Sequence, residues 1–184
     1  MRTTIGIDVA APADLVFGLT RDVGRWPRLL PHYVRVDVLR REPDGAVVAR
    51  FVARRPIVAA LGLGIPVAWQ SRTWNEPDGR RLRFEHRGGA TSGMSVTWRI
   101  EPAGEGCHVT IEHDFRPRIG VWAGFIDRAF TRPIAGRTLA TFKAIAEAIA
   151  ETALVAGEPA APSRDAAVEP VAPSPDAPTP GVTK

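Results

Sequence analysis

The sequence predicts an α+β fold in which a curved antiparallel sheet of about seven strands wraps around a long C-terminal helix. Apolar and polar residues alternate over residues 2–9 and again, from Tyr33, for about eighty residues, which is the period of half-buried strands. Two short helical patterns separate these regions, and apolar residues recur at helical spacing over residues 121–153. Because short turns join most successive strands, the sheet is expected to be antiparallel.

The first helices are predicted from prolines and aspartates that follow the first strand. Pro12 suits the first turn of a helix within residues 11–19, and Asp14 complements its positive end. Asp22 is a candidate N-cap for a second short helix, which Pro27 is expected to end. Two short helices therefore follow the first strand.

Six further strands are predicted, with Gly, Pro and Asp at the turns between them. They cover residues 33–38, 46–54, 65–76, 80–87, 91–102 and 107–116. The apolar segment 55–64 interrupts this series between two strands. We interpret it either as a hydrophobic flap over one end of the sheet or as a mobile lid that contacts a membrane transiently, because exposed apolar loops are uncommon without a purpose.

The C-terminal third contains the long helix and then a change of composition. Pro133 falls inside the helical pattern of 121–153 and is expected to kink or break it, and Gly157 is a suitable terminator. From Gly157 onward the chain holds seven prolines and no aromatic residue, so it cannot bury enough apolar surface to become ordered. We therefore expect a ligand-binding domain over 1–154 and a disordered Pro/Ala-rich tail over 155–184.

Composition and charge exclude several classes of protein. The net charge is +4, but the arginines are scattered along the predicted strands, which indicates a solvated basic surface and no nucleic-acid partner. No run of eighteen apolar residues and no apolar signal segment occurs. Cys107 is the single cysteine, so no internal disulfide can form, which is typical of a cytoplasmic protein. We expect a monomer or a homodimer.

The alternation also predicts which side chains line an interior space. A strongly curved sheet cannot fill its own concave side, so a helix laid across it encloses a cavity. Choosing the more apolar face of the last four strands places fifteen side chains inward, one in every two residues along each strand. The candidate ligand-binding residues are Trp69, Ser71, Thr73, Phe84, Met94, Trp98 and His113, together with Phe125 of the C-terminal helix.

Three polar residues of the predicted interior could do chemistry. His86 and His113 could transfer protons or hold a ligand hydroxyl, or they could be core residues bonded to backbone carbonyls. Tyr33 is a candidate hydrogen-bond donor to a ligand carbonyl. Two histidines without a third inward ligand make an incomplete zinc shell, and no nucleotide fingerprint occurs. The sequence therefore predicts no metal and no cofactor.

A local motif resembles a known family. Pro12 is followed by Asp22-Val23-Gly24-Arg25-Trp26-Pro27-Arg28-Leu29-Leu30-Pro31-His32-Tyr33, and this order resembles the opening of polyketide cyclase/dehydrase-type START-like domains of the SRPBCC superfamily. The resemblance covers residues 2–151 and implies the helix-grip fold. It also implies binding of a hydrophobic, aromatic or polyketide-like molecule, with cyclisation, aromatisation or dehydration as the activity. Because other members carry lipids or quinones without catalysis, a non-catalytic carrier is the alternative.

The resemblance also directs attention to Arg72. In aromatase/cyclases of this superfamily an inward arginine on the strand here at 65–76 is thought to steer enolate formation and ring closure. Without a gap, the equivalent position in this sequence is Thr73, and Arg72 would need a slip of one residue to face inward. If it does, Arg72 could stabilise an enolate oxygen while His86 or Tyr33 moves the proton. These three residues are the catalytic candidates.

Overall fold

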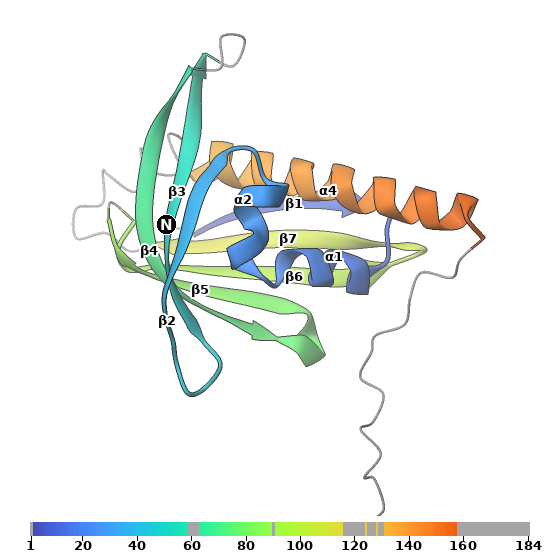
Figure 1. The fold of residues 1–184 in the computed structure, drawn as a ribbon, viewed down its shortest axis with the longest axis horizontal. Helices are drawn as coiled ribbons and strands as arrows, with labels where there is room; N and C mark the ends of the chain where they lie inside the picture. The colour runs from blue at the N-terminus through green and yellow to red at the C-terminus, as the bar shows by residue number, and fades with distance from the viewer. Residues whose placement is uncertain are drawn as a thin grey trace, which may run out of the picture.

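The computed structural model describes residues 2–58, 63–89, 91–115, 124, 128 and 131–157, and Figure 1 shows their arrangement. They form a seven-stranded sheet in the order β1-β7-β6-β5-β4-β3-β2, with every neighbouring pair antiparallel. The strands are β1 (Arg2–Val9), β2 (Tyr33–Arg41), β3 (Val47–Val58), β4 (Leu63–Glu76), β5 (Arg81–Gly88), β6 (Met94–Ala103) and β7 (Gly106–Phe115). The predicted meander and the sheet of seven strands are confirmed.

Helices connect the edge strands and cover the sheet. The connection from β1 to β2 contains α1 (Ala13–Thr20), η1 (Val23–Arg25) and α2 (Trp26–Leu29), while η3 (Pro77–Gly79) joins β4 to β5. The long α4 (Arg132–Val155) lies beside β1 and also contacts α1 and β3 (Figure 1). Its buried residues recur every three or four positions, so one face packs inward: Ala135, Thr138, Leu139, Phe142, Ala146 and Ala150. None of the helices described here is long and apolar enough to cross a membrane.

The two faces of the sheet differ in the way that the alternation predicts. Every second residue of β7 is buried, and β6 buries Met94, Val96, Trp98 and Ile100. In β5, Leu82 and Phe84 are buried and His86 is partly buried. The buried residues of these three strands are almost all apolar: Leu82, Phe84, Met94, Val96, Trp98, Ile100, Cys107, Val109, Ile111 and Phe115. Arginines alternate with them on the other face, where they pair with carboxylates such as Arg83–Glu76 and Arg99–Glu112.

Trp26 joins the short helices to the sheet and to α4. Its side chain is 2% exposed, and its indole Nε1 donates a hydrogen bond to the Thr20 carbonyl at 2.9 Å. Its ring centroid lies 5.2 to 6.1 Å from five other aromatic rings, namely those of Tyr33, Phe51, Phe84, Trp98 and Phe142. Edge-on and tilted contacts at such distances are favourable between aromatic rings. The four-residue α2 is therefore fixed in place by a single large side chain.

One predicted effect of proline is corrected. Asp22 caps η1 as predicted, accepting a hydrogen bond from the Gly24 amide at 3.0 Å, but Pro27 lies in the first turn of α2 and does not end a helix. Pro133 also lies in a first turn, that of α4, which begins at Arg132, so the kink or break expected there stays a prediction for the helical pattern that precedes α4. In a first turn the missing N–H would have no partner in any case, so proline is tolerated there. Residues 121–131 lie largely outside the described part of the chain.

The segment predicted as an apolar excursion is mostly part of a hairpin. β3 continues to Val58 and β4 begins at Leu63, with Arg55 opposite Ile65 and Pro56 opposite Gly64. Figure 1 shows this hairpin projecting beyond the neighbouring strands. A register shift between Pro56 and Val58 accommodates the proline, which cannot donate to the ladder. The flap or lid at 55–64 therefore reduces to the connection 59–62, which lies outside the described residues, as does the predicted tail from residue 158.

Replacing Trp26 should test its place in the core. We expect Trp26→Ala to lower the free energy of unfolding by about 3–5 kcal/mol, because a large aromatic cavity cannot close. Trp26→Phe should cost less, about 1–3 kcal/mol, chiefly because the Thr20 carbonyl loses its partner. Urea unfolding followed by circular dichroism measures both values. Trp74, which lies on the other face of the sheet under the Arg72 guanidinium, is the matched control. A loss in Trp74→Ala as large as that in Trp26→Ala would contradict the expectation.

Candidate functional site

A cavity of about 80 Å³ lies between the inner face of the sheet and the start of α4. One buried water needs about 10–15 Å³ of such space, so the cavity, which is partly open to solvent, has room for several water-sized groups. Its wall comes from α2, from all six strands β2 to β7, and from α4. The lining residues are Trp26, Tyr33, Phe51, Val67, Trp69, Phe84, His86, Thr91, Met94, Val96, Trp98, Ile111, His113, Thr131, Ile134, Ala135 and Thr138.

One wall of this cavity is a row of parallel rings. Phe51 and Trp69 face each other across β3 and β4, with ring centroids 5.3 Å apart and planes 6° from parallel. Trp69 in turn stacks on His86 of β5 at 6.0 Å and 21°. The register of these strands produces the row, because cross-strand neighbours on one face of an antiparallel sheet lie close together. Flat aromatic surfaces of this kind suit a planar ring.

His86 is a neutral imidazole in this setting. Its Nδ1 lies 2.7 Å from the Thr91 hydroxyl, which fixes the ring and leaves Nε2 as the other polar atom. Burial lowers the pKa of His86, the neighbouring His113 adds to the effect, and together they bring it to about 3. Both histidines line the cavity, and His113 is 6% exposed. His86 can therefore hydrogen-bond to a ligand, but at neutral pH it is a weaker base than an ordinary histidine.

Tyr33 belongs to a second polar group, which also includes Thr138 and His32. The Tyr33 and His32 ring centroids lie 5.0 Å apart, and burial raises the pKa of Tyr33 well above its usual range, an effect that the Thr138 side chain partly offsets. Thr138 Oγ1 lies 2.9 Å from His32 Nε2 and 2.8 Å from the Ile134 carbonyl oxygen. Burial lowers the pKa of His32, the charge on Arg137 adds to the effect, and together they bring it to about 4. All three polar side chains are thus uncharged at neutral pH.

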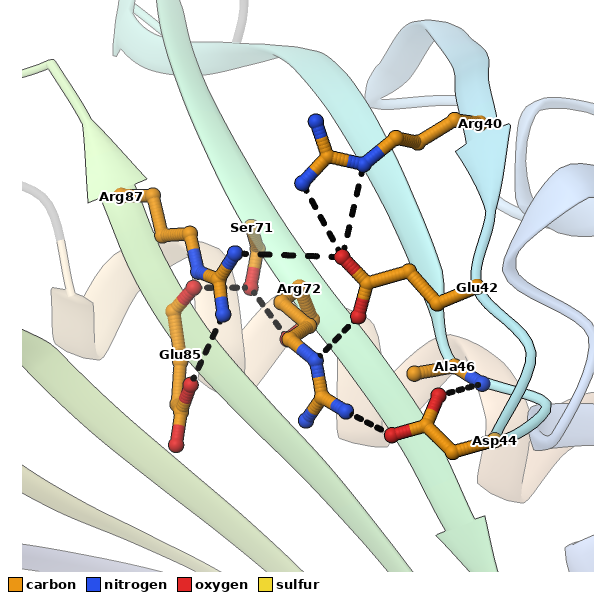
Figure 2. A network of polar contacts seen from close by, with 8 residues as sticks. All are labelled: Arg40, Glu42, Asp44, Ala46, Ser71, Arg72, Glu85 and Arg87. Atoms are coloured by element: carbon orange, nitrogen blue, oxygen red, sulfur yellow. Dashed lines mark hydrogen bonds and ion pairs between the residues drawn. The ribbon is translucent and has the colours of Figure 1, made fainter.

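Arg72 does not belong to the cavity. Figure 2 shows its guanidinium between Glu42, at 2.6 Å, and Asp44, and it also lies 4.8 Å from the Trp74 ring. Glu42 is the main reason that the pKa of Arg72 is raised, and Arg72 is the main reason that the pKa of Glu42 is lowered.

The register of β4 explains this position. Ser71 and Thr73, on either side of Arg72, are buried on the inner face, so Arg72 points the other way. The pairing of β4 with β5 does shift between Gln70 and Ser71, but Arg72 still lies outside the cavity wall. The one-residue slip that would bring Arg72 inward does not occur. Its tentative catalytic role is therefore not supported by its position.

The other predicted site residues divide into three groups. The cavity wall includes Tyr33, Trp69, Phe84, His86, Met94, Trp98 and His113. Ser71 and Thr73 are buried but do not line it, and the Ser71 hydroxyl donates to the Glu85 carbonyl at 3.1 Å. Phe125 lies outside the described residues. Among the residues that the structure describes, no three His, Cys, Asp or Glu side chains are grouped as metal ligands would be.

Several lining residues were not predicted as site residues. Phe51 lies opposite Trp69, but only the cross-strand register reveals this pairing. Trp26 was identified only as part of a local motif. Thr138 is one helical turn from Ile134 and from Phe142, so its position on the inner face of α4 could have been found from helical spacing. The hydroxyl itself gives no signal in the sequence, because threonine also suits a solvent-exposed face.

The sheet order, the long helix across it and the cavity between them define the helix-grip class of START-like domains. Residues 1–151 match the family of polyketide cyclase / dehydrase and lipid transport proteins, and the chain belongs to this family. The match leaves out only part of α4 and the tail. The resemblance found in the sequence and the predicted fold are both confirmed.

Relatives of known name support this placement. The chain is 30% identical over 156 residues to a granaticin polyketide synthase bifunctional cyclase/dehydratase of Streptomyces virginiae, covering 80% of this chain and 48% of that protein. It is 29% identical over 110 residues to a putative polyketide cyclase of Streptomyces cyaneus, covering 59% of this chain and 68% of that protein. The chain thus spans about half the length of the bifunctional relative.

Solved structures share the fold. The di-domain ARO/CYC BexL from the BE-7585A biosynthetic pathway aligns with a TM-score of 0.61 and 30% identity, covering 78% of this chain and 45% of BexL. The Zhui aromatase/cyclase from Streptomyces sp. R1128 aligns with a TM-score of 0.66 and 22% identity, covering 86% of this chain and 98% of Zhui. At this identity the similarity to Zhui establishes the fold alone.

The buried histidines should make stability depend on pH. The pKa of His32 is about 4 in the folded protein and near 6.5 in the unfolded chain, so the unfolded state binds more protons between these values. The stability that the neutral histidine contributes is fully present above pH 6.5 and is lost as pH falls towards 4. For His32 the loss in the free energy of unfolding amounts to roughly 2 kcal/mol by pH 5. His86 acts in the same direction because its pKa is also lowered.

Urea unfolding at pH 7.5 and pH 5 measures this dependence. We expect His32→Gln to lose less stability between the two pH values than the unaltered protein does. His108, which is half-exposed beside Asp8 on the edge of the sheet, supplies the control variant His108→Gln. Equal pH dependence in the unaltered protein and in His32→Gln would show that His32 is not held neutral by burial.

Proposed function

We propose that this domain binds an aromatic or polyketide-like molecule in the cavity and promotes its cyclisation, aromatisation or dehydration. The observation that carries the proposal is the combination of a stacked aromatic wall with two hydrogen-bonding side chains, His86 and Tyr33, on one cavity. The rings would hold a planar substrate, and the polar groups would orient its oxygens. The relatives named as polyketide cyclases, dehydratases and aromatase/cyclases support the same chemistry.

The proposed ring closure is an aldol reaction. A proton leaves a carbon beside a carbonyl, and the resulting enolate carbon forms a bond to a second carbonyl carbon, whose oxygen becomes an alkoxide. The His86 imidazole takes the carbon-bound proton at Nε2, since Nδ1 bonds to Thr91, and returns it to the alkoxide. Loss of that hydroxyl with a further carbon-bound proton, as water, gives the ring double bond. No oxidant or reductant is needed.

A carrier of a lipid or quinone is the second candidate function, and one observation favours it. Among the residues described on the cavity wall none is Arg, Lys, Asp or Glu, and the pKa values of His86 and Tyr33 are both shifted away from neutrality. General acid and base catalysts work best when their pKa lies near the working pH. A binding pocket has no such requirement.

Product analysis distinguishes the two functions. Purified full-length chain is incubated with a polyketide synthase that releases unreduced poly-β-ketone chains, and the cyclised products are quantified by liquid chromatography and mass spectrometry. We expect the chain to shift the products towards one ring pattern. His86→Gln, which preserves size and a polar end, should reduce the rate of that shift by about 10²–10⁴-fold.

Arg72→Gln is the matched control, because Arg72 lies in the outer ion-pair network and not on the cavity wall (Figure 2). It should lower stability and leave the product pattern unchanged. A product pattern that is the same with and without the chain, combined with measurable binding of aromatic compounds, would support the carrier. Loss of the pattern in a folded Arg72→Gln variant would contradict the assignment of the reaction to this cavity.

A further inference from the structure

We propose that two copies of the chain associate through the free edge of β2, pairing antiparallel around a two-fold axis at Val36. β2 is the last strand of the sheet that the described residues form, so only one of its two edges is paired, with β3. Backbone N–H and C=O groups along such an edge are a template for pairing with a further strand. The inference concerns a surface outside the cavity wall, so it does not depend on the proposed function.

Apolar side chains are exposed along this strand. Val34 is 49% exposed, Val38 is 41% exposed and Leu39 is 51% exposed. Sheet edges that stay single are often protected by lysine or proline, and β2 contains neither. Exposed valine and leucine side chains on an unpaired edge favour association with another strand.

The opposite edge of the sheet is occupied by the long helix. β1 is the strand that α4 contacts most. Lys143 Nζ of α4 donates to the Asp8 carbonyl at 2.7 Å, and Glu147 accepts from the Ala10 amide at 2.7 Å. Polar backbone groups at this end of β1 are therefore already bonded. β2 is thus the edge that remains for a second copy, and a two-fold contact closes at a dimer because both copies use the same patch.

The order of side chains along β2 is complementary to itself. Reading Val34-Arg35-Val36-Asp37-Val38 backwards exchanges the arginine with the aspartate and leaves the valines in place. Arg35 and Asp37 lie on the same face, since Arg35 Nε is 2.8 Å from Asp37 Oδ2. In an antiparallel pair centred on Val36, Arg35 of each copy lies opposite Asp37 of the other, with Val34 beside Val38 at each end. This order favours a second copy of the chain over an unrelated strand.

Register shifts limit the length of the contact. The pairing of β2 with β3 shifts between Tyr33 and Arg35 and again between Val38 and Arg40. Bulges of this kind interrupt a ladder, so regular pairing with a second copy covers the stretch between them. So short a contact buries less surface than a permanent dimer does. The dimer should therefore be weak and depend on protein concentration.

Sedimentation equilibrium of the full chain tests the proposal from about 1 µM to about 1 mM, the range in which weak protein contacts dissociate. We expect an equilibrium between monomer and dimer. Arg35→Asp and Asp37→Arg each place like charges opposite one another twice in the dimer, so each should raise the dissociation constant about tenfold or more. Arg2→Asp is the matched control, because Arg2 forms an exposed ion pair with Asp114 at the other edge of the sheet. It should leave the dissociation constant unchanged.

Mixing the two variants gives a sharper test. The Arg35→Asp chain carries two acidic residues at these positions and the Asp37→Arg chain carries two basic ones, so a mixed pair has opposite charges at both. We expect the mixture to form heterodimers with a dissociation constant within about threefold of that of the unaltered dimer. A mixture of Asp37→Arg with Arg2→Asp has the same net charges without complementary edges, and it should form no such heterodimer.

Three outcomes would overturn the inference. They are a chain that stays monomeric at about 1 mM, a dimer that both variants retain, and variants that do not associate when mixed. Circular dichroism checks that each variant folds. If either single variant does not fold, the double variant Arg35→Asp/Asp37→Arg decides, because it keeps an ion pair within β2. It should dimerise with itself and not with the unaltered chain, and free mixing of the two would overturn the inference.

Discussion

The packing of Trp26 against five aromatic rings is the interaction on which the rest of the structure depends. α2 is only four residues long and would not be stable as an isolated helix, so its position comes from this side chain. The same ring contacts the sheet through Phe51, Phe84 and Trp98 and contacts α4 through Phe142. It thereby fixes the distance between the sheet and the helix at one end of the concave side. The cavity is the space that remains between the sheet and α4 next to Trp26, which forms part of its wall.

Desolvation sets the electrostatics of that cavity. Burial is the largest cause of the pKa shift at His32, Tyr33 and His86, and in each case it favours the neutral form. Charged side chains of β4 and β5 lie on the other face of the sheet, where Arg72 and Arg87 share the carboxylate of Glu42 (Figure 2). Because of this separation, the polar groups described on the cavity wall are neutral before any ligand reacts.

The sequence was sufficient for the features that arise from periodicity. Alternation along β7 placed Ile111 and His113 on the inner face, and the same reasoning placed Arg72 outside, because side chains alternate strictly along a strand. Local rules were weaker at prolines, since Pro27 and Pro133 are compatible both with the end and with the first turn of a helix. The His32–Thr138 hydrogen bond could not be predicted, because it joins residues far apart in the chain through tertiary packing alone.

The neutrality of His86 need not prevent proton transfer, because its pKa is a property of its surroundings. The value of about 3 reflects burial and the neighbouring His113, and no carboxylate of the described residues raises it. A substrate that loses a carbon-bound proton to His86 becomes an enolate, and an opposite charge within about 4–6 Å favours the protonated imidazole. In a site of low polarity this attraction is stronger than it would be in water. Abstraction of the proton thus produces an enolate, and its negative charge stabilises the protonated His86 that forms in the same step. The cavity would then work as a catalyst only for ligands able to form an enolate there, and as a simple binding site for all others.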